Sequence, residues 1–309
     1  MDVPAVNAIS VEQNSERQVL RISAASAIYS RAKQVLALQI VLTVLGGFAW
    51  SVTVAWLPQA RVWAAFYAFV VALLDALVLE KTQSALRRSG AKIQELFDCE
   101  LLHLPWRRLT AGDLPDPEGV TEQGSSYIKK NPDLSGIKDW YPPAVSKVSL
   151  PLARLVCQRC NAWWDASLRK RYSVGLQVVL WLLGAFVFAL AIHTGMTLET
   201  FVLAVVAPLT PATLWGVREI QKQDSAKKEL DDLKSHIQQQ WQAALSGSLA
   251  GDALEQASIE IQNSIFQSRS KNPLIFNWLN KQVRDRQQET MNRVAEELVA
   301  QALSKTGGA

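Results

Sequence analysis

Four long apolar stretches, arranged as two pairs, constrain this chain more than any other feature. They run from Gln34 to Leu57, from Val62 to Leu79, from Tyr172 to His193 and from Thr200 to Val217. Each is close to the roughly 20 helical residues that cross a hydrocarbon core about 30 Å thick. The pattern therefore predicts an all-α membrane protein with four transmembrane helices in two hairpins. The alternative is two buried hairpins of a soluble bundle, but buried helices of soluble proteins rarely stay apolar on every face for so long.

Basic residues flank the same side of all four predicted spans. They are Arg17, Arg21, Arg31 and Lys33 before the first, Lys81, Arg87, Arg88 and Lys92 after the second, Arg169, Lys170 and Arg171 before the third, and Arg218, Lys222, Lys227 and Lys228 after the fourth. The loop 58–61 has one Arg, and the loop 194–199 has no Lys or Arg. Because positive charge stays in the cytoplasm, both termini and the middle region are predicted to be cytoplasmic.

This division gives five regions. A cytoplasmic N-terminal helix (1–33) precedes the first transmembrane hairpin (34–79), a cytoplasmic middle region (80–171) separates it from the second hairpin (172–217), and a helical cytoplasmic region (218–309) follows. Large polar regions explain why the 309 residues have a mean hydropathy of only +0.05. The net charge of +4 suits an anionic inner-leaflet surface. It is too dispersed to favour a DNA or RNA polymer as partner.

Small residues recur at every fourth position of the first span: Thr43, Gly47, Ser51 and Ala55. Such a stripe lets another helix backbone approach closely. It predicts a helix-packing face, either within one subunit or between subunits.

Three residues within the spans are candidates for pore or gating roles. Asp75 lies about one helical turn inside the cytoplasmic end of the second span, where an ionisable group is costly unless it faces protein or water. The alternative is an interfacial Asp paired with Lys81 or Arg171. Pro208 and Pro211 remove backbone donors from the fourth span and kink it, which makes either a gate hinge or a static bend.

The cytoplasmic regions are predicted to be helical with turns between helices. Turn-rich sequences occupy 113–119 and 123–126, and an amphipathic segment runs from about Leu150 to Arg171. In the C-terminal region, apolar residues recur at three and four residues on either side of a break at Gly247 and Gly251. These helices are expected to pack on the middle region.

Few residues here suggest catalysis or metal binding. Cys157 and Cys160 form a single pair, to which Cys99 and His103 would have to be added for a zinc site. Cytoplasmic thiols are expected to be reduced, and chance spacing on a helix is the simpler explanation. The sequence contains no P-loop, dinucleotide fingerprint, nucleophile elbow or kinase signature. We therefore expect no enzymatic activity, no metal and no cofactor.

Aromatic and cationic residues gather in and before the amphipathic segment. They are Trp140, Tyr141, Arg154, Arg159, Trp163, Trp164, Asp165 and Arg169. Indoles stack on bases, and guanidinium groups fork onto phosphates, so the seven residues other than Arg154 form a candidate binding site for a small phosphorylated ligand. The alternative is an aromatic belt with cationic anchors before the third span.

Several short motifs occur in a fixed order around the two hairpins. They are Asn7-Ala-Ile-Ser10 with Gln13-Asn14, Tyr29-Ser-Arg-Ala-Lys33, Ile93-Gln-Glu-Leu-Phe-Asp-Cys99 leading to Leu104-Pro-Trp106, Asp139-Trp-Tyr-Pro142, the segment from Cys157 to Tyr172, and Ile265-Phe-x-x-Arg269-x-x-Asn-Pro273 followed by Trp278 and Arg284. In this order they resemble the SMODS-associating four-transmembrane effectors of bacterial conflict systems. The resemblance covers nearly the whole chain.

The resemblance implies a pore-forming effector of the bacterial inner membrane. A partner nucleotidyltransferase would make a cyclic or oligonucleotide signal on infection, and the effector would then permeabilise the membrane. The resemblance also strengthens the assignment of the aromatic and cationic residues described above, which we call the Trp/Arg group, as the ligand site. Four helices enclose too little space for a wide channel, so a homo-oligomer is expected. The alternative function is a membrane-anchored scaffold or receptor that recruits a cytoplasmic partner without forming a pore.

Overall fold

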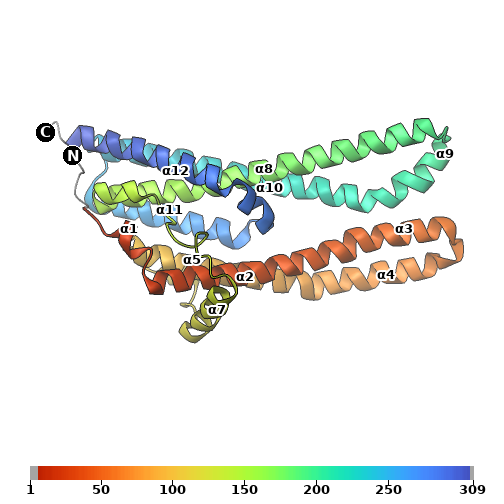
Figure 1. Cartoon of the computed structure of the whole chain (residues 1–309), viewed down its shortest axis with the longest axis horizontal. Coiled ribbons are helices and arrows are strands. Elements are labelled where there is room, and N and C mark those ends of the chain that lie inside the picture. Colours follow the sequence, from red (N-terminus) through yellow and green to blue (C-terminus); the bar gives the residue numbers. More distant parts are fainter. Residues whose placement is uncertain (1–5, 307–309) are drawn as a thin grey trace.

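The computed structural model describes residues 6–306, apart from the side chains at positions 55, 58, 203, 204, 208 and 306. Within this part of the chain every regular element is a helix. Two long helical hairpins extend in the same direction from a helical bundle (Figure 1). Both ends of the described chain lie at the far end of the bundle, away from the hairpin tips.

The first hairpin consists of two nearly continuous helices joined by a short tip. Its elements are α2 (Glu16–Ile40), the π-helical η1 (Val41–Gly46), α3 (Gly47–Trp56), the tip η2 (Pro58–Ala60), α4 (Arg61–Leu74), the π-helical η3 (Asp75–Leu79) and α5 (Glu80–Leu101). The second hairpin consists of α8 (Leu150–His193), α9 (Leu198–Phe201), the π-helical η5 (Val202–Val206) and α10 (Ala207–Leu245). Four helices of the bundle, α2, α5, α8 and α10, therefore continue directly from the hairpins.

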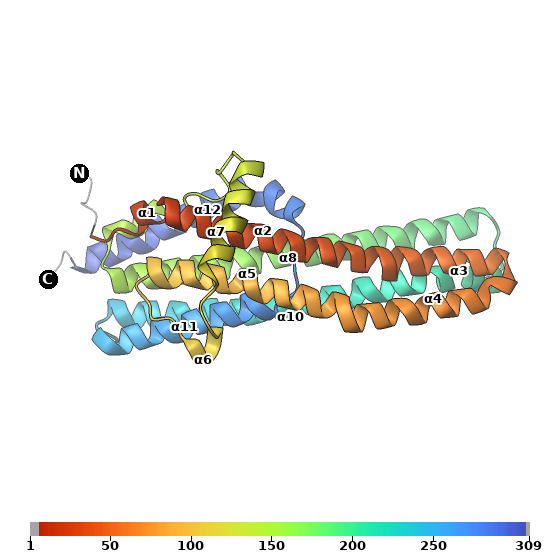
Figure 2. The ribbon, with the colours of Figure 1, turned by 90° about the horizontal axis from the view of Figure 1, so that it is seen from below.

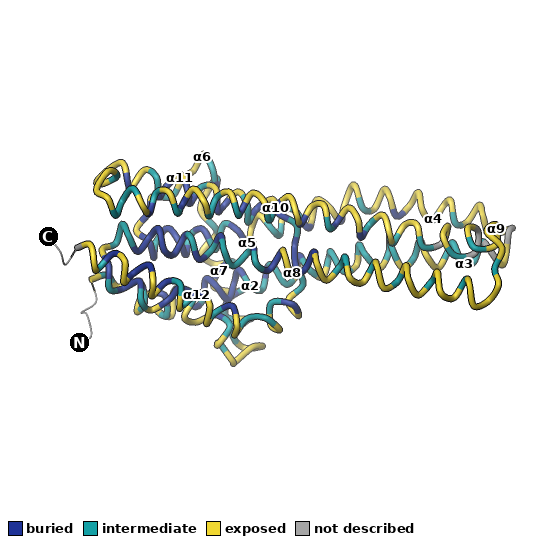
Figure 3. The backbone as a smooth tube through the Cα atoms, turned by 90° about the horizontal axis from the view of Figure 1, so that it is seen from above, coloured by how far each residue is buried: buried dark blue, intermediate teal, exposed yellow. Residues whose placement is uncertain are grey.

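Three helices are long and apolar enough to cross a membrane: Glu16–Val54, Arg61–Leu101 and Leu150–His193. Their most apolar windows are 0%, 11% and 0% buried within the described chain, and Figure 3 shows the hairpins as mostly exposed. A soluble bundle would have buried these faces, since soluble monomers rarely expose such large apolar surfaces. The all-α membrane protein is confirmed in this coarse form. The predicted fourth span lies in α9, η5 and α10, along α8, and four spans remain a prediction.

The bundle is built where the long helices continue beyond the apolar stretches. There α11 (Gly251–Lys271) packs on α5 and α8, α12 (Asn277–Thr306) packs on α8, and the short α1 (Ile9–Glu12) lies against the 3₁₀ turn η4 (Pro143–Lys147). Packing of the C-terminal helices on the middle region is thereby confirmed. The break before α11 is also confirmed, because Gly247 and Gly251 have φ angles of +76° and +56°, which glycine adopts most easily.

One prediction for the middle region is wrong. The turn-rich sequence 123–126 lies within α7 (Pro117–Lys130), which follows the single-turn α6 (Arg108–Ala111) and crosses α2 (Figure 2). The Asp116 side chain caps α7 by accepting from the Gly119 amide over 2.9 Å. Gly124 serves close packing instead of a turn, because an added Cβ would lie 2.5 Å from the Leu20 carbonyl oxygen. A capped start and a crossing partner thus override the local turn composition.

Candidate functional site

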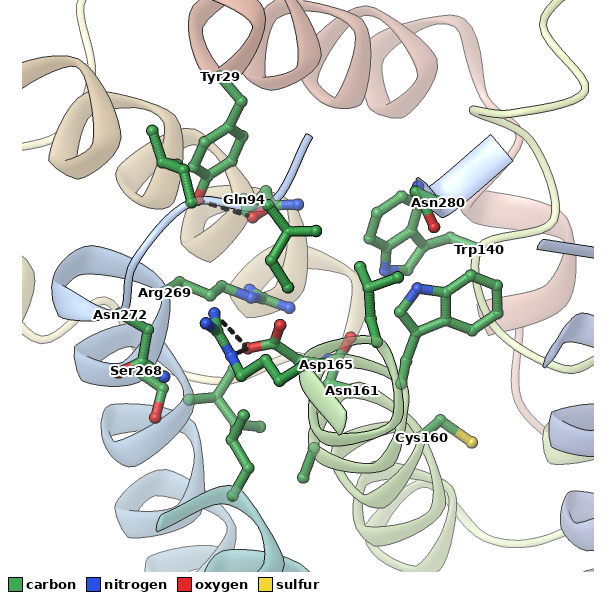
Figure 4. Close-up of a pocket in the computed structure, with 18 of the residues that line it drawn as sticks. Tyr29, Gln94, Trp140, Cys160, Asn161, Asp165, Ser268, Arg269, Asn272 and Asn280 are labelled. Carbon is green, nitrogen blue, oxygen red and sulfur yellow. Dashed lines mark hydrogen bonds and ion pairs between the residues drawn. The ribbon is translucent and has the colours of Figure 1, made fainter. Parts of the chain in front are cut away.

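A cavity of about 230 Å³ lies in the bundle, and its lining includes Lys33, the residue directly before the first predicted span. Its wall is formed by α2, α5, α8, α10, α11, α12 and the segment before η4. Figure 4 shows Asp165 at its centre, Arg269 and Asn272 on one side, and Trp140 beside Asn280 on the other. Helices from both hairpins and from the C-terminal region therefore meet at one space.

The cavity lining is strongly cationic. Four cationic side chains line it, Lys33, Arg169, Arg269 and Arg284, against one carboxylate, Asp165. Arg169 is 5% exposed and already forms hydrogen bonds within the protein. Its Nε donates to Asp165 Oδ2 over 3.1 Å, and its Nη1 donates to Gln223 Oε1 over 2.7 Å and to the Pro273 carbonyl over 3.0 Å. Asp165 therefore neutralises Arg169, and Lys33 and Arg284, which form no ion pair with a described residue, leave the cavity with a positive field.

Arg269 joins the cavity to a buried polar network on α5. Its Nη1 donates to Oδ2 of Asp98 over 2.5 Å, and Asp98 is 0% exposed. Asp98 also accepts from the Tyr141 hydroxyl over 2.6 Å and from Gln262 over 3.1 Å. Burial lowers the pKa of Arg269, but Asp98, Tyr141 and Glu95 more than offset it, so this pKa ends above its ordinary value. Arg269 is therefore a firmly charged wall residue.

Arg284 is the cavity cation with the fewest polar contacts among the described residues. Its guanidinium forms no hydrogen bond or ion pair with any residue in the described range 6–306. Burial lowers its pKa from the ordinary value, as expected for a cation without a close counter-ion. A bound anion would supply that counter-ion.

Two buried amide atoms in the cavity lining also lack partners. The Nδ2 atom of Asn272 is a donor, and the Oδ1 atom of Asn280 is an acceptor; neither has a hydrogen-bond partner in the described part of the chain. Buried polar atoms are usually satisfied. An unused donor, an unused acceptor and an unpaired guanidinium around one space fit a polar, anionic ligand.

The structure divides the predicted Trp/Arg group between the cavity and other contacts. Five of the seven residues that we assign to a ligand site line the cavity: Trp140, Tyr141, Trp164, Asp165 and Arg169. Tyr141 is 1% exposed, and its backbone amide donates to the Gln13 side chain over 2.7 Å, so it also holds its own segment in place.

The other two predicted residues lie outside the lining. Arg159 donates to Gln238 of α10 over 3.1 Å, and Trp163 packs against the main hydrophobic core. The neighbouring Arg154 caps the end of α5 by donating to the carbonyls of Leu102 and His103 over 2.7 and 2.8 Å. Their positive and aromatic character thus serves packing between helices.

Much of the lining comes from segments that we did not assign to a site from the sequence. Lys33 is on α2, Arg269 is on α11, and Asn280 and Arg284 are on α12. Arg269, Asn272 and Arg284 all occur in the last of the family motifs quoted above. That motif was the available signal, because no local pattern relates these positions to Trp140 or Trp164.

The connection from α11 to α12 ties the two hairpins together beside the cavity. We call residues 271–281 the α11–α12 corner. Its Pro273 and Leu274 carbonyls accept from Arg169 and Gln223 of the second hairpin over 3.0 and 3.4 Å. Its Asn277 accepts from Lys33 of the first hairpin over 2.5 Å and donates to the Ser30 hydroxyl over 3.3 Å. A change in the cavity wall would therefore act on both hairpins.

The candidate gating residues lie inside the hairpins, each near a π-helical segment. Asp75 opens η3 and accepts from Gln39 of α2 over 2.7 Å. Its hydrogen-bond partner is thus Gln39, and neither Lys81 nor Arg171, the partners named in the alternative, forms an ion pair with it in the range 6–306. Pro211 lies inside α10, just after η5. The side chain of Pro208 lies outside those described. π-Helical turns often mark functional sites in helices.

The small-residue stripe faces the second hairpin at one point. A Cβ on Gly47 would lie 3.8 Å from Cβ of Pro211, so α3 approaches α10 within one subunit. Thr43 and Ser51 bond back to the carbonyls of Gln39 and Gly47 over 2.7 and 2.9 Å. The side chain of Ala55 lies outside those described. At Gly47 the stripe thus serves packing within one subunit.

The three cysteines are buried free thiols. Cys160 lines the cavity, Cys157 lies in the core, and His103 is exposed beside Glu12. Among the described residues, no three His, Cys, Asp or Glu side chains are grouped to hold a metal ion.

Comparison with known proteins places the chain in a family. A probable CBASS effector molecule of Bacillus cereus (strain VD146) is 24% identical over 283 residues, which cover 87% of this chain and 90% of that protein. No solved structure matches the chain. The family model described as the SMODS-associating 4TM effector domain matches residues 7–298. The chain belongs to the family of SMODS-associating 4TM effector domains.

Proposed function

We propose that this protein is a membrane effector of a bacterial anti-phage defence system, which opens a pore in the inner membrane when a cyclic or oligonucleotide signal binds. Membership of the 4TM effector family and the likeness to a probable CBASS effector support a role in defence. The observation that carries the ligand assignment is the cavity, with four cations, one carboxylate and two unsatisfied amide atoms. A partner nucleotidyltransferase would supply the signal.

The proposed topology has four spans, 34–57, 62–79, 172–193 and 200–217, with both termini and the middle region in the cytoplasm. Both ends of the described chain lie opposite the hairpin tips, which supports this arrangement. The basic residues near the spans lie on the bundle side, except for Arg61 at the tip of the first hairpin. In this arrangement the cavity opens to the compartment where the signal is made.

The cavity residues suit separate parts of a nucleotide. Arg284, Arg269 and Lys33 would bind phosphate oxygens, because charge-assisted bonds to phosphate are among the strongest hydrogen bonds. Trp140 and Trp164 offer indole faces for bases. The unsatisfied Asn272 donor and Asn280 acceptor would contact base edges. Every one of these side chains is already in the cavity wall.

The size of the cavity implies that ligand binding moves its walls. Its volume of about 230 Å³ is below the roughly 300–1,000 Å³ of ordinary small-molecule pockets. A signal of two or more nucleotides would have to widen it. The α11–α12 corner is the wall that bonds to both hairpins, so widening would shift one hairpin against the other. Moving a population from 1% to 99% open needs about 5.5 kcal/mol of preference for the open state.

The pore itself would form between subunits. Within one subunit, Asp75 is bonded to Gln39, and Gly47 faces Pro211, so the polar and small residues of the spans already have internal partners. We propose a homo-oligomer in which movement of the hairpins redirects Asp75 to a polar lumen. The protein would act without catalysis.

Binding can be tested by isothermal titration of cyclic and linear oligonucleotides into detergent-purified protein. We expect Arg284→Gln to weaken binding of the best ligand by about 10–100-fold, as expected for loss of a charged hydrogen bond, with an unchanged melting temperature because Arg284 makes no bond in the free protein. Arg293→Gln is the matched control, since Arg293 is on the same helix and 73% exposed. Equal binding by both variants would refute the cavity assignment.

A second variant separates a pore from a scaffold. Asp75→Asn keeps an acceptor for Gln39 but removes the charge from the span. A pore should keep its ligand affinity and change its conductance or its toxicity to cells. A scaffold should be unchanged in every assay, and that result would favour the alternative function.

A further inference from the structure

The α11–α12 corner lies at the level where both hairpins leave the predicted membrane. Asn277 bonds to Ser30 and to Lys33, the residue directly before the first predicted span. On its other side, Ile275 and Leu279 pack with Leu168, with Tyr172, the first residue of the third predicted span, and with Leu176 inside that span. The corner therefore reaches the edge of the hydrocarbon region from the cytoplasmic side.

The corner presents one large aromatic side chain to its surroundings. Trp278 is 61% exposed, whereas its neighbours Ile275 and Leu279 are 7% and 8% exposed. Residues 271–281 contain two cations, Lys271 and Lys281, both exposed, and no Asp or Glu. Exposed cations of other helices, Arg31 of α2 and Lys170 and Arg171 of α8, precede the spans at the same level. Acids on the nearby helices are mostly bonded within the protein: Asp224 accepts from Ser173, Asp165 pairs with Arg169, and Glu219 accepts from Gln223. Glu80 and Asp285 are exposed.

An exposed indole with lysines on both sides matches the chemistry of a membrane interface. Tryptophan concentrates at the headgroup level because its ring is apolar and its N–H needs a polar partner. Each basic residue close to an anionic leaflet adds about 1 kcal/mol of attraction. Neither lysine of the corner forms an ion pair with a residue in the range 6–306. Their charges are thus available to lipid phosphates.

We infer that the α11–α12 corner is a second membrane-binding surface, which inserts Trp278 into the headgroup layer of the cytoplasmic leaflet and binds anionic phospholipid through Lys271 and Lys281. The inference rests on the proposed span positions, and it does not depend on a pore. It makes α12 an interfacial element in addition to the spans.

The test uses three variants in proteoliposomes, each with one added cysteine that carries a dye. Native Cys99, Cys157 and Cys160 are 5%, 0% and 7% exposed, so protein without an added cysteine should take up almost no thiol-reactive dye. An environment-sensitive dye is attached to Trp278→Cys at the corner, to Trp181→Cys in the third predicted span, where Trp181 is 80% exposed, and to Gln239→Cys. Gln239 is exposed on α10, 22 residues beyond Val217 (239 − 217 = 22), or about 33 Å along a helix.

Nitroxide lipids and aqueous iodide then report where each dye lies. We expect the label at 278 to be quenched severalfold by a shallow nitroxide and shielded from iodide relative to 239, and the label at 181 to be quenched by a deep nitroxide. If 278 behaves like 239, or is reached by neither quencher because protein covers it, the inference fails while the spans stand. If 181 also escapes the lipid quencher, the span assignment fails.

The lysines are tested by lipid composition. With the label at 278, shallow quenching should be several times stronger in vesicles containing anionic phospholipid than in neutral vesicles. Lys271→Gln with Lys281→Gln should remove that difference, whereas the matched pair Lys228→Gln with Lys234→Gln should keep it. These two lysines lie 11 and 17 residues beyond Val217 (228 − 217 and 234 − 217), which is about 16 and 26 Å along α10. Equal quenching in both vesicle types by the unsubstituted corner would contradict a role for the lysines.

Discussion

The Nζ atom of Lys33 donates to Oδ1 of Asn277 over 2.5 Å, which fastens the first hairpin to the α11–α12 corner at the rim of the cavity. If ligand binding opens the protein by moving this corner, fixing it to α2 should prevent opening. A disulfide between Ser30→Cys and Asn277→Cys would fix the corner to α2 at the point where Asn277 Nδ2 already donates to Ser30 Oγ over 3.3 Å. Because a bound nucleotide has to widen the cavity, we expect the oxidised protein to bind nucleotide more weakly and to release no dye from liposomes, and reduction to restore both.

The control for this lock is a disulfide within one hairpin. Ser173→Cys with Asp224→Cys joins α8 to α10, where the native side-chain oxygens lie 2.7 Å apart. That disulfide should leave release unchanged. Normal release from the fully oxidised Ser30–Asn277 variant would show that the corner does not have to move relative to α2.

The buried pair of Asp98 and Arg269 should dominate the stability of the bundle. Asp98→Asn would leave Arg269 without the carboxylate that it bonds to directly, at a cost on the order of 3–5 kcal/mol. Thermal unfolding in detergent should show a large drop in melting temperature. The exposed pair Arg293–Glu289, 2.8 Å apart, is the control, and Glu289→Gln should have no measurable effect. A small effect of Asp98→Asn would mean that the network is not a structural anchor.

Glu95 should make the protein less stable as the pH rises. It lies 16 residues beyond Leu79 (95 − 79 = 16), outside the predicted span, and is 5% exposed. Burial first, and the nearby Asp98 second, raise its pKa from 4.5 to about 7. The folded state therefore holds a proton that the unfolded state has lost, so stability present below pH 4.5 is lost progressively up to about pH 7. The loss is on the order of 3 kcal/mol.

The check on Glu95 is a pH series of unfolding measurements. Glu95→Gln should flatten the dependence between pH 5 and 8 and raise stability at pH 8, since the amide keeps an acceptor for Gln262, now 2.8 Å from Glu95. Glu260→Gln, on an exposed part of α11, is the control. A variant with the same pH dependence as the unsubstituted protein would assign it to another group.

Two adjacent glycines of the first hairpin should respond differently to alanine. A Cβ on Gly46 would lie 1.9 Å from the Tyr67 hydroxyl, which donates to the Leu42 carbonyl over 2.8 Å. Tyr67 would have to move and lose this bond, worth about 1–2 kcal/mol in a membrane. A Cβ on Gly47 meets only Pro211 at an ordinary 3.8 Å. Gly46→Ala should therefore lower the melting temperature, and Gly47→Ala should not; equal effects would contradict the packing described.

The spans and the helical class could be predicted from the sequence because apolar length is a local property. The helix breaks at Gly247 and Gly251 were predictable for the same reason. The loop predicted at 123–126 was not, because the crossing of α7 over α2 requires glycine at 124 for contact with Leu20, and a distant partner decides that position.

The candidate site was predictable in part: the residues on α8 could be predicted from the sequence, and those on other helices could not. On α8, Asn161, Trp164, Asp165 and Leu168 recur at three and four residues and face the cavity. Arg159 and Trp163 lie two residues from Asn161, about 200° around the helix, so periodicity could have separated them. Lys33, Arg269 and Arg284 arrive from α2, α11 and α12, and only the packing of the bundle brings them together.

The central claim is that a nucleotide bound in the cationic cavity opens a path through the membrane. The most direct test is release of a trapped dye from liposomes containing the purified full chain, on addition of each cyclic or linear oligonucleotide in turn. We predict rapid release with at least one nucleotide, and none from Arg284→Gln at the same concentration. Intact liposomes with a nucleotide that demonstrably binds the protein would contradict the claim.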